Sequence, residues 1–262
     1  MLTDSLEDFT CERMTFRGKS KDVFWKGSGP AVILLTEIPG ITPEVADFGR
    51  RIVRAGFTVA LPDLFGTPGR SYAQGYALRS IARACISQEF HIFATGKSSP
   101  VTQWLRLLVN EASQRCSGKG VGVIGMCLTG SFALSLAVDP LVQVPVMSQP
   151  SLPFPIGLRR KKDLGVSKEE LNSVKARIED EQLCIIGLRF TNDRAVPTER
   201  FESLRQELGD GFLGVEIDSS QPNDAGFSKD AHSVLTTEFR DNQGFPTKQA
   251  HDLIINHFAA RL

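Results

Sequence analysis

The 262-residue sequence lacks an excess of charge of either sign, because 30 Lys and Arg residues balance 30 Asp and Glu residues. A neutral chain has no overall field that would favour nucleic acid or an anionic membrane over a small molecule. The sequence also lacks an apolar run long enough to span a bilayer, and its acidic N-terminus lacks the pattern of a signal peptide. We therefore expect a cytoplasmic protein that binds neither nucleic acid nor membranes.

Closely spaced cysteines are also missing. The five cysteines are odd in number and widely separated, and no C-x-x-C pair suggests a zinc site or a redox couple. We therefore expect free thiols, and we expect all but one of them to be inert small apolar residues. The cysteines are Cys11, Cys85, Cys116, Cys127 and Cys184.

Short apolar runs alternate along the chain with segments of helical periodicity. Residues 31–35 form a continuous apolar run, as a strand buried on both faces requires, and a helix from Pro43 is expected to end near Gly56. This alternation predicts one α/β domain over residues 1–262, with a mostly parallel sheet covered by helices on both faces. Further strands are expected at 57–62, before residue 127, and at 145–148, 183–188 and 212–217. Further helices are expected at 101–114, at 197–208 and at 247–262. One more is expected to follow the strand before residue 127 and to run through residue 138.

Two polar stretches interrupt the alternation. Arg159 to Lys162 are consecutive basic residues, as in some nucleic-acid-binding segments, but acidic residues follow and no aromatic platform accompanies them. We expect a solvated loop there. Ser167 and Glu170 have the spacing of a capping box, in which each side chain binds a backbone amide of the other residue. A helix is therefore predicted to start at this point.

The connection between residues 65 and 100 contains several glycines around a helical segment at 77–86. Segments of this length in a compact domain often form lids over a site. An ordinary surface excursion fits the sequence equally well. If the segment is a lid, His91 is a candidate for substrate contact.

The stretch Gly125-Met126-Cys127-Leu128-Thr129-Gly130 joins a β-branched apolar run to small residues suited to a helix. It resembles a nucleophile elbow, in which a strained turn presents the nucleophile at the carboxyl edge of the sheet. Cysteine stands where serine is usual, and the N-terminus of the following helix favours a thiolate. The pattern has glycine two residues after the nucleophile, where this chain has threonine. The alternative is a core cysteine at an ordinary turn.

A cysteine nucleophile needs a base and an acid that orients the base. Asp193 follows the buried strand at 183–188, and His232 lies in a loop after the last strand. The chain order of nucleophile, acid and histidine is that of α/β-hydrolases. Taken alone, Asp193 fits a turn or a helix cap, and His232 fits a surface loop. Together with Cys127, their order and their positions at strand ends favour a catalytic triad.

With these residues the sequence resembles the dienelactone hydrolase family, the cysteine-nucleophile members of the α/β-hydrolase superfamily. The similarity covers most of the chain from about residue 31 onward. It implies a single α/β-hydrolase domain with a mostly parallel central sheet. The motifs that carry it are Glu37-Ile38-Pro39-Gly40, Ala55-Gly56-Phe57, Leu61-Pro62-Asp63-Leu64, the elbow, and the acid and histidine segments.

The resemblance implies roles for individual residues. Cys127, Asp193 and His232 match the family triad, and Glu37 matches a glutamate that holds the resting thiol and helps to deprotonate it. The backbone N–H groups of Ile38 and Leu128 match the oxyanion hole. The implied reaction is hydrolysis of a small ester, lactone or thioester through a thioester acyl-enzyme, without a metal or an organic cofactor. A monomer or small homo-oligomer is expected.

The arginines of the sequence depart from the family pattern. Family members that hydrolyse dienelactone grip its carboxylate with arginines, one of them a few residues after the histidine. Here the next arginine after His232 is Arg240, and Arg79 or Arg83 is a candidate substitute. Two other interpretations remain open. One is a non-catalytic protein of this fold that binds a ligand or a partner chain. The other is a redox sensor, although no resolving cysteine lies near Cys127 in sequence.

Overall fold

The structure is a computed structural model that describes residues 3–86, 100–152 and 157–262. Within these residues eight strands form one sheet, with the order β1-β2-β4-β3-β5-β6-β7-β8. The pairs β1–β2 and β2–β4 are antiparallel, and all other neighbouring strands are parallel. The strands are β1 (Thr10–Phe16), β2 (Lys19–Lys26), β3 (Ala31–Leu35), β4 (Thr58–Pro62), β5 (Val121–Met126), β6 (Val142–Ser148), β7 (Ile185–Phe190) and β8 (Phe212–Ile217).

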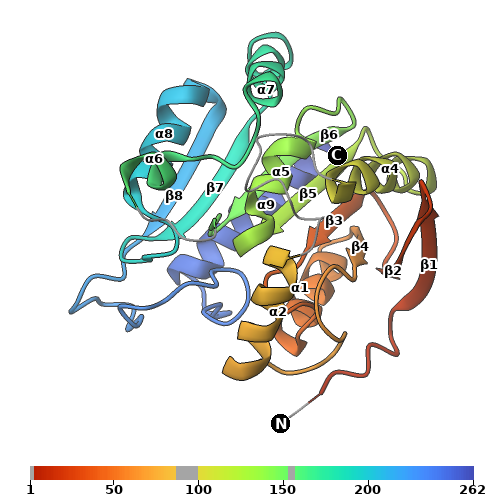
Figure 1. Cartoon of the computed structure of the whole chain (residues 1–262), viewed down its shortest axis with the longest axis horizontal. Coiled ribbons are helices and arrows are strands. Elements are labelled where there is room, and N and C mark those ends of the chain that lie inside the picture. Colours follow the sequence, from red (N-terminus) through yellow and green to blue (C-terminus); the bar gives the residue numbers. More distant parts are fainter. Residues whose placement is uncertain (1–2, 87–99, 153–156) are drawn as a thin grey trace.

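Helices cover both faces of this sheet (Figure 1). Alternate residues of β3 point into two separate hydrophobic cores, with Ile33 in one and Val32 in the other. The first core contains buried side chains of α4 (Pro100–Arg115), α5 (Gly130–Leu136), α7 (Lys168–Glu181) and α8 (Thr198–Leu208). The second contains those of α1 (Pro43–Arg54) and α9 (Pro246–Arg261). The predicted α/β architecture with a doubly covered sheet is therefore confirmed.

The central strands are almost entirely apolar, with Thr58 in β4 and Arg189 in β7 as polar exceptions. Every residue of β3, β4, β5 and β7 is buried, because helices pack on both faces of these strands. A strand with two covered faces has no position at which a polar side chain reaches water. The apolar runs are therefore a consequence of the layered architecture, and they place the carboxyl ends of the strands at one edge of the sheet.

The first two strands were not predicted. Only Met14 of β1 is buried, and β2 buries only Val23 and Trp25. These strands form an antiparallel hairpin at the edge of the sheet, where one face meets water and polar residues are tolerated. Such strands carry no continuous apolar run, so the pattern that identified the central strands is absent.

The two polar stretches differ in outcome. The capping box is present, since the Ser167 hydroxyl accepts from the Glu170 amide and the Glu170 carboxylate accepts from the Ser167 amide, each at 3.1 Å. The expected loop at 159–162 is wrong, because these residues belong to a short helix, α6 (Leu158–Lys162). Contacts with α8 stabilise it: Arg200 donates to the Arg160 carbonyl, and Lys161 pairs with Glu199 at 3.0 Å. Neither contact is visible in the local sequence.

The segment suggested as a lid is described in part. It contains α2 (Gln74–Ile86), as the helical pattern predicted, while residues 87–99, including His91, lie outside the described residues. None of the helices in the described ranges combines the length and the apolar character that a membrane span needs.

Candidate active site

The turn between β5 and α5 holds Cys127 in a conformation that most residues avoid. A single 3-10 turn, η2 (Cys127–Thr129), separates the strand from the helix, and Cys127 has φ = +54°. Such left-handed values are uncommon for residues other than glycine and concentrate at functional sites. A Cβ atom at Gly125 would lie 2.2 Å from the Thr129 carbonyl oxygen, so the turn closes only with glycine there. The strand-turn-helix context of the predicted elbow is therefore present.

Thr129 fits the turn because its hydroxyl is used as a brace. The side chain is fully buried, and Oγ1 accepts from the Met126 amide at 2.8 Å. Its own proton has two well-placed carbonyl acceptors, Leu35 at 3.0 Å and Met126 at 2.9 Å. Threonine in the glycine position thus ties the elbow to the carboxyl end of β3.

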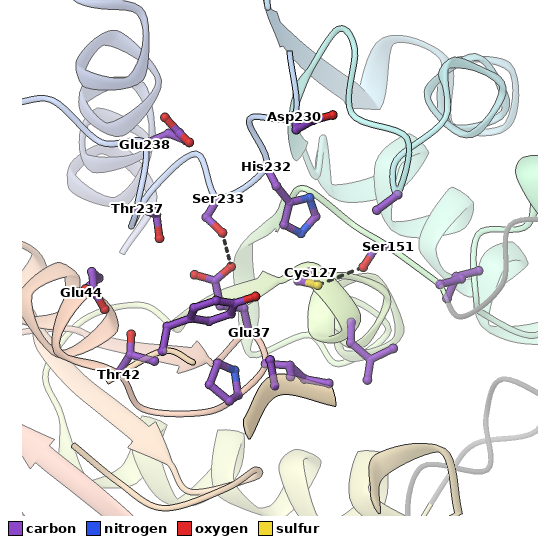
Figure 2. A pocket seen from close by; sticks show the side chains of 17 residues that line it. Glu37, Thr42, Glu44, Cys127, Ser151, Asp230, His232, Ser233, Thr237 and Glu238 are labelled. Carbon is purple, nitrogen blue, oxygen red and sulfur yellow. Dashed lines mark hydrogen bonds between the residues drawn. The ribbon is translucent and has the colours of Figure 1, made fainter. Parts of the chain in front are cut away.

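The sulfur of Cys127 faces Ser151, a residue that the sequence analysis did not single out. The Ser151 hydroxyl oxygen lies 3.0 Å from Sγ, and the Ser151 amide donates to the Cys127 carbonyl at 3.0 Å (Figure 2). Ser151 is buried and follows β6, the strand next to β5. The sequence signal for Ser151 was its position as a polar residue just beyond a buried strand. Many turn residues share this feature, so it does not single out Ser151.

Asp193 and His232 come together as expected from the sequence. Asp193 is buried just beyond β7, and its Oδ2 lies 2.6 Å from Nδ1 of His232. The other carboxylate oxygen accepts from the Ala195 amide at 2.9 Å, which fixes the orientation of the acid. The Cys127 side chain also acts on the imidazole, because its charge and its hydrogen bonding both raise the pKa of His232.

The surroundings of His232 favour its protonated form. Burial by itself lowers the pKa of the imidazole, but the charge of Cys127 and the hydrogen bond to Asp193 outweigh it. The pKa of His232 is therefore raised well above 6.5. An imidazolium next to the sulfur stabilises a thiolate, which is the nucleophilic form of cysteine.

Glu37 lies in the same site, but its contacts correct the expected resting state. Its carboxylate accepts from Ser233 Oγ at 2.7 Å, from Thr236 Oγ1 and from Gln149 Nε2 at 3.1 Å. The described hydrogen bonds include none between Glu37 and the sulfur, which contacts Ser151 and His232 instead. Three hydroxyl and amide donors already occupy the carboxylate, so Glu37 does not hold the thiol in this structure. It does anchor the segment that follows His232.

The two residues whose backbone amides are expected to form an oxyanion hole both lie in the site. Ile38 follows Glu37 after β3, and Leu128 follows Cys127 at the start of η2. Both residues line the same cavity as Cys127. Among the described hydrogen bonds none is donated by either amide.

These groups open into a cavity of about 610 Å³ at the carboxyl edge of the sheet (Figure 2). Tyr72 and Ala77, from the segment suggested as a lid, contribute to its wall. Arg79 is exposed on α2 and does not line it, and the side chain of Arg83 lies outside the described residues. The described lining residues are Glu37, Ile38, Pro39, Thr42, Glu44, Tyr72, Ala77, Cys127, Leu128, Ser151, Leu152, Ala195, Asp230, His232, Ser233, Thr237 and Glu238.

A buried arginine holds two of the loops that build the site. Arg200 of α8 is 1% exposed, and its Nη1 donates to the Pro150 carbonyl at 3.0 Å and to the Ala195 carbonyl at 3.3 Å. Burial lowers the pKa of this guanidinium to about 10. Arg200 thereby links the loop of Ser151 to the loop of Asp193. Sequence reasoning missed it because its acceptors are main-chain carbonyls distant in sequence.

No group of three or more histidine, cysteine or acidic side chains suited to a metal ion occurs in the part of the chain that the structure describes. The cysteines whose side chains are described, Cys11, Cys116, Cys127 and Cys184, are free thiols as expected.

Comparison with known proteins agrees with this geometry. The sequence model of the dienelactone hydrolase family matches residues 16–244. The chain belongs to this family. A carboxymethylenebutenolidase of Rhodococcus opacus is 28% identical over 111 residues, which span 42% of this chain and 39% of the relative. The match thus extends over about two fifths of that protein's length.

Solved structures show the same fold across nearly the whole chain. A dienelactone hydrolase of Anabaena variabilis is 16% identical, with a TM-score of 0.57 and coverage of 97% of this chain and 98% of that one. A dienelactone hydrolase-like promiscuous phosphotriesterase from metagenomic libraries is 14% identical, with a TM-score of 0.63 and coverage of 97% and 98%. At these identities the likeness concerns the fold.

Proposed function

We propose that the protein is a dienelactone hydrolase-like enzyme that hydrolyses small esters, lactones or thioesters with Cys127 as nucleophile. One observation carries the proposal: the strained elbow holds the Cys127 sulfur against an imidazole whose Nδ1 is bound to Asp193 at 2.6 Å. The sulfur faces a cavity large enough for a small substrate. Family membership supports the same class of reaction.

The proposed reaction has two halves. The Cys127 thiolate attacks the carbonyl carbon, and the resulting oxyanion accepts hydrogen bonds from the amides of Ile38 and Leu128. His232 then gives its proton to the leaving alcohol oxygen, and a thioester remains on Cys127. Water, deprotonated by the now neutral His232, attacks this thioester. Collapse of the second intermediate releases the acid and restores the thiolate with its imidazolium.

Three further residues have positioning roles in this proposal. Asp193 fixes the imidazole so that its other nitrogen faces the sulfur. Ser151 donates to the sulfur when it carries negative charge, both in the resting thiolate and as the thiolate leaves in the second half. Glu37 orients Ser233 and Thr236, which flank the histidine loop, rather than binding the thiol itself.

The test of the nucleophile is Cys127→Ala. We expect hydrolysis of a p-nitrophenyl ester to fall by on the order of 10³-fold or more, because the variant lacks the thiolate that attacks the carbonyl in the proposed reaction. Cys184→Ala is a matched control, since that thiol lies elsewhere and burial raises its pKa. Near wild-type turnover in Cys127→Ala would reject the proposal.

Alkylation distinguishes an enzyme from a ligand-binding protein of the same fold. Iodoacetamide at a pH near 6.5 should label Cys127 first, because the imidazolium stabilises its thiolate. Burial raises the pKa of the Cys116 and Cys184 thiols, and that of Cys11 is raised too, so these should react slowly. Equal labelling of all cysteines, together with undetectable ester hydrolysis, would favour the binding protein.

A further inference from the structure

Apart from the Cys127–His232 pair, whose charges offset each other, the described walls of the cavity carry charge of only one sign. Four of its lining residues are acidic: Glu37, Glu44, Asp230 and Glu238. None of the described lining residues is lysine or arginine. Because the chain as a whole is neutral, this excess of negative charge is local to the cavity that holds the nucleophile.

The deepest of these carboxylates has no cationic partner among the described residues. Glu37 is 7% exposed, and its contacts come from two hydroxyls and one amide. Neutral donors satisfy its hydrogen bonds but leave its charge uncompensated in a partly desolvated site. Such a carboxylate gains most from a cation placed in the adjoining cavity.

The outer carboxylates are weakly compensated. Among the described residues Glu238 pairs with Arg240, with Nη2 and Oε2 4.0 Å apart and the arginine side chain 52% exposed. Glu44 lies in the first turn of α1, where the helix dipole favours a negative charge, and no described ion pair involves it or Asp230. Figure 2 shows Glu44 and Glu238 on the same side of Glu37, with Asp230 beyond His232.

The remaining wall suits an organic cation. Tyr72 lines the cavity and is 54% exposed, and aromatic faces attract ammonium groups. The carboxylates are not gathered into a group of three or more metal-ligating side chains within the described residues. The position of the family's carboxylate-binding arginine after His232 is occupied here by Ser233 to Thr236, and Thr236 binds Glu37.

We infer that the substrate is cationic: an ester or thioester whose alcohol or acyl part carries an ammonium group. The inference rests on the proposed hydrolase function and adds the charge of the substrate to it. A negative wall of low dielectric concentrates cations at the nucleophile and repels anions. An anionic lactone is therefore a poor substrate for this site.

Three acetate esters of similar size test the inference. Acetylcholine is cationic, 3,3-dimethylbutyl acetate is its neutral isostere, and 2-sulfoethyl acetate is anionic. We expect kcat/KM, measured by acid release at constant pH, to be about tenfold or more higher for the cation than for its neutral isostere, and lowest for the anion. The preference should shrink in about 0.5 M salt, because screening weakens charge interactions across an open cavity.

Substitution of Glu44 and Glu238 tests whether these carboxylates cause the preference for the cationic ester. The double variant E44Q/E238Q should lose most of the preference for the cation, measured as the ratio of kcat/KM for acetylcholine to kcat/KM for 3,3-dimethylbutyl acetate. E202Q is the matched control, since Glu202 is exposed on α8 and does not line the cavity. An unchanged charge preference in E44Q/E238Q would overturn the assignment to these residues.

A labelling measurement reports the same field without requiring turnover. Cationic and anionic methanethiosulfonates of equal size react with Cys127, and the labelled peptide is quantified by mass spectrometry. After division by the rate ratio for a free small thiol, we expect the cationic reagent to react about tenfold faster. Equal rates, or a faster anionic reagent, would contradict the inference.

The two measurements separate the two claims. Cys127-dependent hydrolysis without a charge preference overturns the cationic substrate and leaves the hydrolase. Hydrolysis of none of the three esters, with a cation-selective Cys127, counts against the hydrolase and supports a cavity that selects cations.

Discussion

At the scale of single residues, Thr129 shows how a departure from a motif is accommodated. The elbow pattern has glycine there, where this chain has threonine. In the structure the hydroxyl accepts from the Met126 amide at 2.8 Å and has the Leu35 carbonyl within 3.0 Å. The cost of a larger side chain is offset by hydrogen bonds that glycine lacks.

The titration of His232 is a direct test of its contact with Cys127. The charge of Cys127 is the largest cause that raises the pKa of His232, so we expect this pKa to fall in Cys127→Ala. Resonances of the imidazole in NMR titrations of both proteins measure the shift. An unchanged pKa would contradict contact between the two side chains.

The same pKa has a consequence for stability, with a defined sign. The pKa of His232 is higher in the folded protein than its ordinary value of 6.5. Its stabilising contribution is therefore fully present below pH 6.5 and is lost as the pH rises through the folded-state pKa. Denaturation by urea should show a smaller loss of stability over this alkaline range in Cys127→Ala than in the wild type.

Some residues of the site were predictable and others were not. Cys127 and Asp193 follow strand ends, His232 lies in the loop after β8, and all three carry chemically distinctive side chains, so chain order and position were sufficient to propose them. Ser151 and Arg200 act through contacts across the fold, with the sulfur and with main-chain carbonyls. No local pattern separates them from other serines and arginines. Glu37 was identified, but its hydrogen-bond partners depend on side-chain positions that sequence does not specify.

At the scale of elements, the close approach of α5 to the loop after β6 positions the sulfur relative to Ser151. A Cβ at Gly130 would lie 2.7 Å from Cα and Cβ of Pro150. Gly130→Ala should therefore shift the loop, lower the free energy of unfolding by about 1–3 kcal/mol and reduce ester turnover. Urea denaturation and kcat measure the two effects.

Gly75→Ala is the matched control for this prediction. Gly75 lies in α2 and no atom would come within 4 Å of its added Cβ. Alanine there should raise stability by up to about 0.5–1 kcal/mol, as expected for glycine replacement in a helix. If Gly130→Ala unfolded at the same urea concentration as the wild type, the close approach would not constrain the loop.

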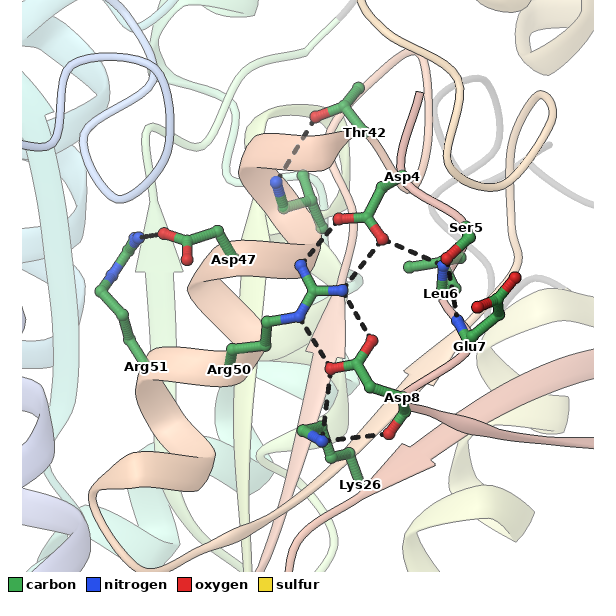
Figure 3. Close-up of polar contacts among 11 residues, drawn as sticks. Asp4, Ser5, Leu6, Glu7, Asp8, Lys26, Thr42, Asp47, Arg50 and Arg51 are labelled. Atoms are coloured by element: carbon green, nitrogen blue, oxygen red, sulfur yellow. Dashed lines mark hydrogen bonds and ion pairs between the residues drawn. The ribbon is translucent and has the colours of Figure 1, made fainter. Parts of the chain in front are cut away.

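The N-terminal segment is tied to α1 by a cluster of charges (Figure 3). Arg50 donates to both carboxylate oxygens of Asp4, at 2.7 and 2.9 Å, and to both of Asp8, at 2.8 and 2.7 Å. Lys26 of β2 also pairs with Asp8, at 3.3 Å. The hydrogen bonds from Arg50 lower the pKa of Asp4 and of Asp8 below the ordinary value of 3.8.

This cluster predicts a specific sensitivity to acid. Carboxylates with lowered pKa contribute stability that is present above pH 3.8 and is lost as the pH falls through their folded-state pKa. Arg50→Met should therefore melt below the wild type at neutral pH, with a difference that shrinks in acid. Arg54→Met, an exposed position on the same helix, is the control. A difference independent of pH would contradict the role of these ion pairs.

At the scale of the whole molecule, the fold was predictable where burial on both faces forces an apolar sequence. That condition holds for β3, β4, β5 and β7, and it defined the parallel sheet and the edge at which the site lies. It fails for β1 and β2, whose positions depend on pairing rather than on burial, and for α6, which contacts of α8 stabilise. Elements held by long-range contacts leave little trace in the local sequence.

The central claim is that Cys127 carries the acyl group between the two halves of the reaction. Its most direct test is intact-protein mass spectrometry after brief mixing with p-nitrophenyl acetate and quenching in acid. The account predicts one added acetyl group, located on the peptide that contains Cys127 and absent from Cys127→Ala. Turnover of this ester with the acetyl group found on another residue, or with the same adduct persisting in Cys127→Ala, would contradict it.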